Sequence, residues 1–284
     1  MSFEEKNKTE KGTLYLVATP IGNLADLSER AIKVLSEVDF IAAEDTRNSL
    51  RLLSALGISK PMISYFEHNK HERGEQIAAR LLAGEACALI TDAGTPAISD
   101  PGEDIVALCA GSGIPVSSIP GPCAAIVALT LSGLPTARFC FEGFLSANKS
   151  ERVKHLSSLA GETRTMIFHE APHKLKVTLS DMCATFGEDR RVSLCRELTK
   201  LNEEVMRTTL GDAVKHYNEN NPRGEYVIVV EGAGESALKD DWSQMTVKQH
   251  VESYISSGMS KMDAMKAVAR DRGVSKSEIY KEMI

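Results

Sequence analysis

The sequence predicts an α/β protein built from two domains and a small helical appendage. Over residues 13–230, short apolar runs alternate with segments of helical spacing, which is typical of sheets covered by helices. The length of 284 residues and a hydrophobic content of 43% suffice for two cores. We expect a disordered tail at 1–11, domains at 12–136 and 137–232, a linker at 233–244 and a helical unit at 245–284.

The first domain is expected to contain a mostly parallel sheet with helices on both faces. Apolar runs predict strands at 13–18, 40–43, 62–66, 86–91 and 114–119. Between them, helices are expected from Asp26, which has capping-box spacing with Glu29, and at 50–56, 76–82 and 104–110. A further helix is expected to open at 123–125.

The second domain repeats the alternation with one difference. Strands are expected at 139–145, 165–169, 191–198, 205–210 and 225–230, and helices at 152–159, 173–186 and 212–218. Only a few polar residues separate the runs at 191–198 and 203–210, which is typical of an antiparallel hairpin. The second sheet is therefore predicted to be mixed.

The end of the chain has the pattern of a helix-turn-helix. Helical spacing recurs at 247–255, 261–270 and 277–283, and Ser260 with Asp263 and Ser275 with Glu278 have capping-box spacing. Gly273 separates the last two helices. Residues 245–284 carry seven Lys or Arg against five Asp or Glu. A cap on the second domain and an RNA-contacting appendage both remain open.

The amino-acid composition and the distribution of apolar and charged residues exclude several classes of protein. The longest nearly apolar stretch, 123–134, falls short of the roughly 20 residues that cross a bilayer, and the charged start of the chain lacks the apolar core of a signal peptide. A cytoplasmic protein without membrane or DNA partners is expected. The six single cysteines predict free thiols, and no metal site is expected, although His68 and His71 lie three residues apart.

Three loops of the first domain predict a ligand site. They are rich in small residues and follow predicted strands, at 19–23, 91–102 and 120–125. In open α/β sheets ligands bind at the carboxyl ends of the strands, where small residues allow close approach to the backbone. Neither a P-loop nor a Gly-x-Gly-x-x-Gly motif is present, so the loops do not predict an ordinary nucleotide site.

The loops carry a family resemblance. Thr-Pro-Ile-Gly-Asn at 19–23, Ala-Ala-Glu-Asp-Thr-Arg at 42–47, Asp-Ala-Gly-Thr-Pro at 92–96 and Arg-Glu-Leu-Thr-Lys at 196–200 make the chain resemble the tetrapyrrole methylase superfamily over 12–284. The resemblance implies two αβα domains with S-adenosylmethionine (SAM) in the cleft between them, and a homodimer. For the branch with Ala-Glu-Asp-Thr-Arg it implies 2'-O-methylation of a cytidine ribose in the decoding region of 16S rRNA, in the small ribosomal subunit.

The resemblance also implies cofactor contacts. They fall in the three loops and at two places of the second domain, namely on Pro20, Gly94, Thr95, Pro96, Ile98, Cys123, Ala124, Glu170 and Leu198. Asp92 stands where porphyrin methylases have an apolar residue or glycine, and we count it with this site.

Methyl transfer to a hydroxyl needs alignment and a proton acceptor. Asp45 matches a proton acceptor of some relatives, but it could equally pair with Arg47 or cap the following helix. His68 is a second candidate base, and Lys200 is expected where cofactor and acceptor meet. Neither base is preferred.

RNA requires cations that contact phosphate. Candidates flank the predicted loops or lie near Phe144, where an aromatic ring could stack on a base: Arg47, Arg51, Lys149, Arg152, Lys154 and Arg196. Each could instead be an ordinary surface charge.

Two rival functions remain: a SAM-dependent methylase of a tetrapyrrole or other small acceptor, and a non-catalytic RNA-binding protein.

Overall fold

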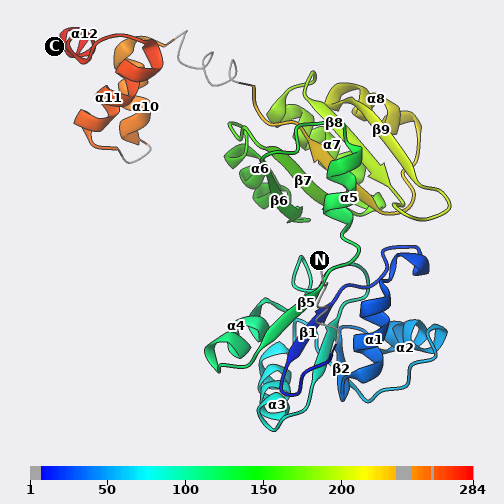
Figure 1. Ribbon diagram of the computed structural model, residues 1–284. Helices are drawn as coiled ribbons and strands as arrows, with labels where there is room; N and C mark the ends of the chain where they lie inside the picture. Colours follow the sequence, from blue (N-terminus) through cyan, green and yellow to red (C-terminus); the bar gives the residue numbers. More distant parts are fainter. Residues whose placement is uncertain (1–7, 235–244, 257–258, 284) are drawn as a thin grey trace, which may run out of the picture.

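The computed structural model describes residues 8–234, 245–256 and 259–283. The tail expected at 1–11 is thus described only from residue 8, and the expected linker lies outside the described residues from 235 to 244. The described chain consists of two α/β domains, each with a five-stranded sheet and its helices, and a group of C-terminal helices (Figure 1).

The first sheet is parallel throughout, as predicted. Its strands are β1 (Leu14–Val17), β2 (Phe40–Ala43), β3 (Met62–Ser64), β4 (Cys87–Ile90) and β5 (Val116–Ile119), in the order β3-β2-β4-β1-β5. Its helices are α1 (Glu29–Glu37), α2 (Thr46–Ala55), α3 (Lys70–Leu82) and α4 (Glu103–Gly111). Apolar side chains pack into a core on each face, which leaves the carboxyl ends of the strands free for loops.

Two helices of this domain begin where their caps dictate. The start predicted at Asp26 is wrong, because Asn23 caps a 3-10 turn, Leu24–Asp26, and Ser28 caps α1 by accepting from the amide of Ala31. Helix α2 begins four residues before its predicted start, because the side chain of Asp45 accepts from the amide of Arg47.

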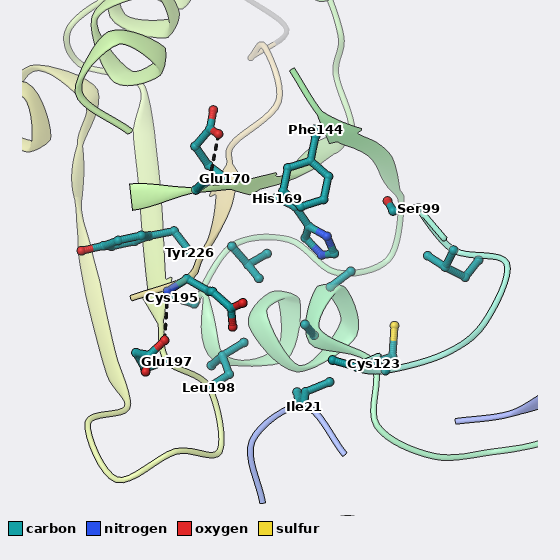
Figure 2. A pocket seen from close by; sticks show the side chains of 18 of the residues that line it. Ile21, Ser99, Cys123, Phe144, His169, Glu170, Cys195, Glu197, Leu198 and Tyr226 are labelled. Atoms are coloured by element: carbon teal, nitrogen blue, oxygen red, sulfur yellow. Dashed lines mark hydrogen bonds between the residues drawn. The ribbon is translucent and has the colours of Figure 1, made fainter. Parts of the chain in front are cut away.

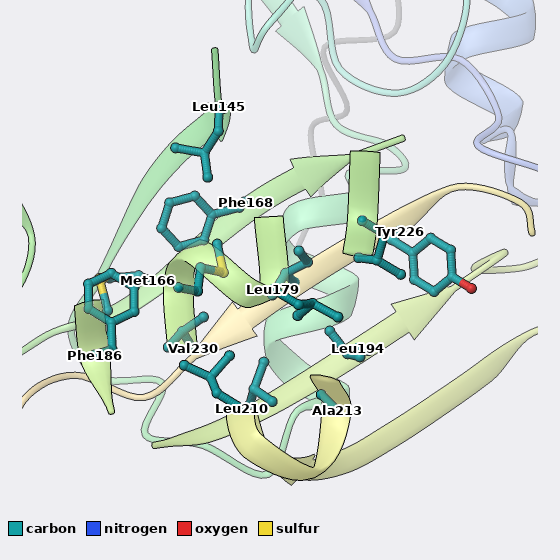
Figure 3. Packing of buried hydrophobic residues seen from close by; sticks show 14 of the residues in the cluster. Leu145, Met166, Phe168, Leu179, Phe186, Leu194, Leu210, Ala213, Tyr226 and Val230 are labelled. Atoms are coloured by element: carbon teal, nitrogen blue, oxygen red, sulfur yellow. The ribbon is translucent and has the colours of Figure 1, made fainter. Parts of the chain in front are cut away.

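The second sheet is mixed, as predicted. Its strands are β6 (Phe139–Phe144), β7 (Thr165–Glu170), β8 (Arg191–Arg196), β9 (Glu204–Thr209) and β10 (Tyr226–Val230), in the order β6-β7-β10-β8-β9. Strands β6 and β7 are parallel, the other neighbours are antiparallel, and β8 and β9 form the predicted hairpin. Figure 3 shows the core between one face and its helices, which are α6 (Lys149–Ser158), α7 (Pro172–Phe186) and α8 (Leu210–Glu219).

Helix α5 (Ala124–Leu131) covers the other face of the second sheet, although it precedes the boundary expected at 136. Its buried residues Ala125, Ala128 and Leu129 pack with Ile167 and Val229. The faces of the first sheet are already covered by α1 to α4, so this apolar helix is buried against the second sheet instead. The chain therefore crosses between the two sheets at residues 120–123.

The C-terminal helices have a core of their own. Helices α10 (Val247–Ser256), α11 (Lys261–Arg272) and α12 (Lys276–Glu282) bury Val251, Met265, Val268 and Ile279 among themselves. The capping box of Ser275 and Glu278 is confirmed, and Gly273 ends α11 in the left-handed region. Whether this unit is a cap or contacts RNA stays a prediction.

The structure also bears on the expectations about the cysteines and about membrane-spanning helices. All six cysteines are free, and Cys87, Cys109 and Cys195 are buried. Of the helices that the structure describes, none combines the length and the apolar character needed to cross a membrane.

A buried ion pair joins α6 to α7 and gives a test of stability. Arg152 is 6% exposed and its Nε lies 2.7 Å from Oδ2 of Asp181. Removing one partner leaves a buried charge unpaired, so Asp181→Ala is expected to lower the free energy of unfolding by about 3–5 kcal/mol in urea denaturation. Asp212→Ala removes the partner of the exposed Lys215 and should cost no more than about 1 kcal/mol. Equal losses in the two variants would contradict a structural role for the buried pair.

Candidate functional site

The three loops predicted to bind a ligand are joined to one another by hydrogen bonds. Thr19 and Gly94 exchange backbone hydrogen bonds of 2.9 and 3.1 Å, and the Thr19 hydroxyl donates to the carbonyl of Thr91 at 3.0 Å. The Thr95 hydroxyl donates to the carbonyl of Pro122 at 3.0 Å. The loops therefore form one continuous wall at the carboxyl ends of β1, β4 and β5.

A cavity of about 460 Å³ lies between this wall and the second domain (Figure 2). Its size is typical of small-molecule sites. Among the expected cofactor residues, those that line it are Asp92, Gly94, Thr95, Ile98, Cys123, Ala124, Glu170 and Leu198. Pro20 and Pro96 belong to the same loops but are not among its lining residues.

Of the three expected catalytic residues, only Lys200 lines the cavity. Its ammonium lies 3.0 Å from Oε1 of Glu197 and 2.7 Å from Oε2 of Glu225. Partial burial alone would lower the pKa of Lys200, but the hydrogen bonds to Glu225 and Glu197 outweigh it and raise that pKa. Lys200 is thus a cation near neutral pH, suited to contact or position an acceptor and unsuited to act as a base.

Asp45 has the structural role that was left open for it. Its Oδ1 accepts from the amide of Arg47 at 2.8 Å, and its Oδ2 pairs with the Arg47 guanidinium at 3.0 Å. These hydrogen bonds lower the pKa of Asp45 to about 2, which makes it a weak proton acceptor. Neither Asp45 nor the exposed His68 is among the residues that line the cavity.

Three further carboxyl groups gather beside the second loop. Asp92 and Asp100 line the cavity; Glu44 accepts from the Thr91 hydroxyl at 3.2 Å, and Asp92 accepts from Asn48 at 3.0 Å. Burial raises the pKa of Glu44, and the charges of Asp100 and Asp92 add to this effect. Burial, with a smaller effect of Asp92, also raises the pKa of Asp100. Glu44 and Asp100 are therefore better proton acceptors than an ordinary surface carboxylate.

The second domain approaches the first loop at Gly22. A Cβ on Gly22 would clash with the Lys200 side chain and lie 3.0 Å from the carbonyl oxygen of Leu198. The backbone that meets it is unusual, because Glu197 and Thr199 have φ angles of 51° and 64°. Such conformations are uncommon outside glycine and are often found at functional sites.

Glu170 is buried and its carboxylate is fully engaged. It accepts from the Thr178 hydroxyl at 2.6 Å and from the amide of Ala171 at 2.9 Å, and it pairs with Lys174 at 3.3 Å. Its side chain is therefore fixed within the second domain.

His169 is the clearest residue that sequence reasoning missed. It lines the cavity, and its Nε2 is buried without a hydrogen-bond partner among the described residues. Burial lowers the pKa of His169, which keeps the ring neutral. The sequence carried no signal for it because a lone histidine in a strand is ordinary. Glu225 was not singled out either. Ser99 and Glu197 also line the cavity; they lie in the predicted loop at 91–102 and in the motif at 196–200, but sequence reasoning did not name them as site residues.

The candidate RNA-binding cations lie outside the cavity. Arg152 is buried and paired with Asp181, so it is a structural residue rather than an accessible cation. Arg196 pairs with Glu204 at 3.3 Å. The exposed candidates are Arg47, Arg51, Lys149 and Lys154. Within the described ranges, no cluster of His, Cys, Asp and Glu is arranged to hold a metal ion.

Comparison with known proteins identifies the family of this chain. A family model for tetrapyrrole (corrin/porphyrin) methylases matches residues 13–214. The chain is 48% identical over 281 residues to a protein of Halalkalibacterium halodurans named Ribosomal RNA small subunit methyltransferase I, covering 98% of this chain and 96% of that one. A Bacillus subtilis protein of the same name is 45% identical, with coverage of 99% and 96%.

Solved structures show the same fold at low sequence identity. Diphthine synthase superposes with a TM-score of 0.60 at 15% identity, over 78% of this chain and 90% of that one. The cobalamin biosynthetic enzyme cobalt precorrin-4 methyltransferase gives 0.58 at 16% identity, over 78% and 95%. By family model and by relatives, the chain belongs to the tetrapyrrole (corrin/porphyrin) methylase family, in the group named Ribosomal RNA small subunit methyltransferase I.

Proposed function

We propose that this protein transfers the methyl group of SAM to the 2'-oxygen of a cytidine ribose in the decoding region of 16S rRNA, within the small ribosomal subunit. The observation that carries the proposal is the cavity formed where the three loops meet the second domain, in a chain 48% identical to a named rRNA methyltransferase. A homodimer in the cytoplasm remains part of the proposal.

The lining of the cavity fits this cofactor. Carboxylates outnumber cations among the lining residues, since Lys200 is accompanied by Asp92, Asp100, Glu170, Glu197 and Glu225. Such a lining favours a ligand that carries positive charge. Ile21, Ile98 and Leu198 offer apolar surface, and the unpartnered Nε2 of His169 offers a hydrogen-bonding group. Bound SAM supplies a methyl group on a sulfonium cation, and the wall around Gly94, Thr95 and Cys123 would hold it.

The chain's own residues have two tasks in this reaction. The first is to hold the acceptor oxygen in line, which supplies much of the acceleration when the donor is already reactive. Lys200, fixed by Glu197 and Glu225, is placed to orient the acceptor. The second is to accept the hydroxyl proton. Asp45 and His68 stay candidates, but we favour Asp100, which lines the cavity and has a raised pKa.

Cations around the cavity would hold the RNA. Because the cavity itself is acidic, the phosphates must be met outside it, where Arg47, Arg51, Lys149 and Lys154 are exposed. Arg196 is a further candidate if RNA replaces its exposed partner Glu204. Each such contact positions the RNA without reading its sequence.

Transfer of labelled methyl groups tests the proposed reaction. Small ribosomal subunits from cells that lack this gene, incubated with the protein and labelled SAM, are expected to gain label on one cytidine ribose. Digestion to nucleosides distinguishes a ribose from a base. SAM binding without transfer to subunits or to naked rRNA would contradict the proposal and favour a small acceptor, to be sought among tetrapyrroles.

Gly94 gives a test of the cofactor wall. Its φ angle is +87°, and a Cβ would lie 3.4 Å from Cγ2 of Ile21, at the edge of the cavity. Gly94→Val is expected to weaken SAM binding at least about 100-fold, measured by titration calorimetry, because the added side chain fills the place of the ligand. Gly113→Val is the matched control, since Gly113 has a φ of +69° and open space around it. Equal SAM affinity in the two variants would remove Gly94 from the site.

Substitution of Asp100 is expected to affect both the melting temperature and the rate of methyl transfer. Because burial and Asp92 disfavour its charge, Asp100→Asn is expected to raise the melting temperature at pH 7. The gain should shrink as the pH falls through the raised pKa of Asp100 in the folded protein. It should be absent below the ordinary pKa of aspartate, where Asp100 is protonated in both the folded and the unfolded chain. The rate of methyl transfer should fall about 10²- to 10⁴-fold if Asp100 accepts the proton.

The control for this variant is Asp189→Asn, at an exposed site away from the cavity. An unchanged transfer rate in Asp100→Asn would return the role of base to Asp45 or His68.

A further inference from the structure

Phe144 reaches the mouth of the cavity because of an irregularity in its strand. In β6, Phe141 pairs with Ile167 but Gly143 pairs with Phe168, so Glu142 is an extra residue, and Gly143 has a φ of +64°. Side chains three positions apart normally point to opposite faces of a sheet. The bulge brings Phe144 onto the face of Phe141, where it lines the cavity, as bulges beside active sites often do.

The Phe144 ring is in contact with its neighbours and is also half exposed. The imidazole of His169 lies edge-on between the two phenylalanines, with centroid distances of 5.1 Å to Phe141 and 5.3 Å to Phe144. Figure 2 shows the rings of Phe144 and His169 side by side. Phe144 is nevertheless 55% exposed. An aromatic ring that lines a cavity and still has half of its surface open is placed to receive a flat ligand.

A cation lies over the Phe144 ring. Nζ of Lys174 lies 5.8 Å from the Phe144 centroid and is kept there by its ion pair with the buried Glu170. Lys174 belongs to α7, and Phe144 to β6, so two elements of the second domain combine an aromatic surface with a positive charge. Proteins that recognise single-stranded RNA use this combination, stacking a base on the ring and meeting the backbone with the cation.

We propose that Phe144 is a stacking platform for the nucleobase of the acceptor nucleotide, with Lys174 beside it for the backbone of the RNA. The inference rests on the proposed function and adds to it one contact between the protein and the acceptor nucleotide. A base splayed out of the RNA and stacked on Phe144 at the cavity mouth would bring its own ribose to the cavity, where the carboxylates and Lys200 lie. The platform would thus select a nucleotide that is free to leave its stack.

Substitution of Phe144 tests the platform. Phe144→Leu keeps an apolar side chain but removes the aromatic face, and it is expected to lower kcat/KM for small subunits roughly 10- to 100-fold, mainly through KM. Its affinity for SAM, measured by calorimetry, should stay within about twofold of the parent protein. Phe144→Tyr retains the ring and should restore most of kcat/KM. Phe139→Leu is the matched control, because Phe139 is exposed on the same strand and does not line the cavity.

The outcomes separate this inference from the proposed function. If the parent protein transfers methyl groups to RNA and Phe144→Leu does so equally well, the platform is overturned and the function stands. If Phe144→Leu weakens SAM binding and leaves the KM for RNA unchanged, the ring packs on the cofactor and the platform is again overturned. If the parent protein transfers no methyl group to any RNA, both fail together.

Discussion

The exchange of two backbone hydrogen bonds between Thr19 and Gly94 is the constraint on which the site depends. It joins the loop after β1 to the loop after β4, and Thr95 extends the connection to the loop after β5 through Pro122. Backbone groups make this bridge, so the side chains at these positions remain small and leave room for a ligand. The cavity wall is rigid because it continues the hydrogen bonding of the sheet beyond the last regular strand residues.

On the opposite side of the cavity, the second domain contributes charged side chains that are already held by hydrogen bonds or ion pairs. Glu170 is held by Thr178, and Lys200 by Glu197 and Glu225. Groups fixed in this way need little reorganisation when a ligand arrives. On the side of the first domain, burial raises the pKa values of Glu44 and Asp100, with a further effect of neighbouring carboxylates, Asp100 and Asp92 on Glu44 and Asp92 on Asp100. Carboxyl groups with shifted pKa values are common at catalytic sites.

Much of the fold could be predicted from the sequence, because strand runs and helix caps are local signals. The parallel first sheet, the hairpin of β8 and β9 and the capping box at Ser275 follow from them. The loops of the site were predictable because they follow strands. The packing of α5 on the second sheet was not, since an apolar helix does not reveal which sheet will bury it.

Side chains that meet only in three dimensions escaped prediction. His169 and Glu225 were not named as site residues, and their place in the cavity depends on the pairing of β7 with β10 and on the approach of the two domains. Arg152 is an error of the opposite kind, a residue that was expected to contact RNA but is buried. An arginine in a basic stretch resembles a surface charge in the sequence, and only the structure shows its buried partner Asp181.

The crossing of the chain at residues 120–123 has a mechanical consequence. Within the described chain the two sheets are joined covalently at this crossing, and helix α5, which follows it, is packed on the second sheet. Cys123 and Ala124, at the start of that helix, also line the cavity. Because the same residues join the two sheets and line the cavity, any rotation of one sheet against the other would change the width of the cavity.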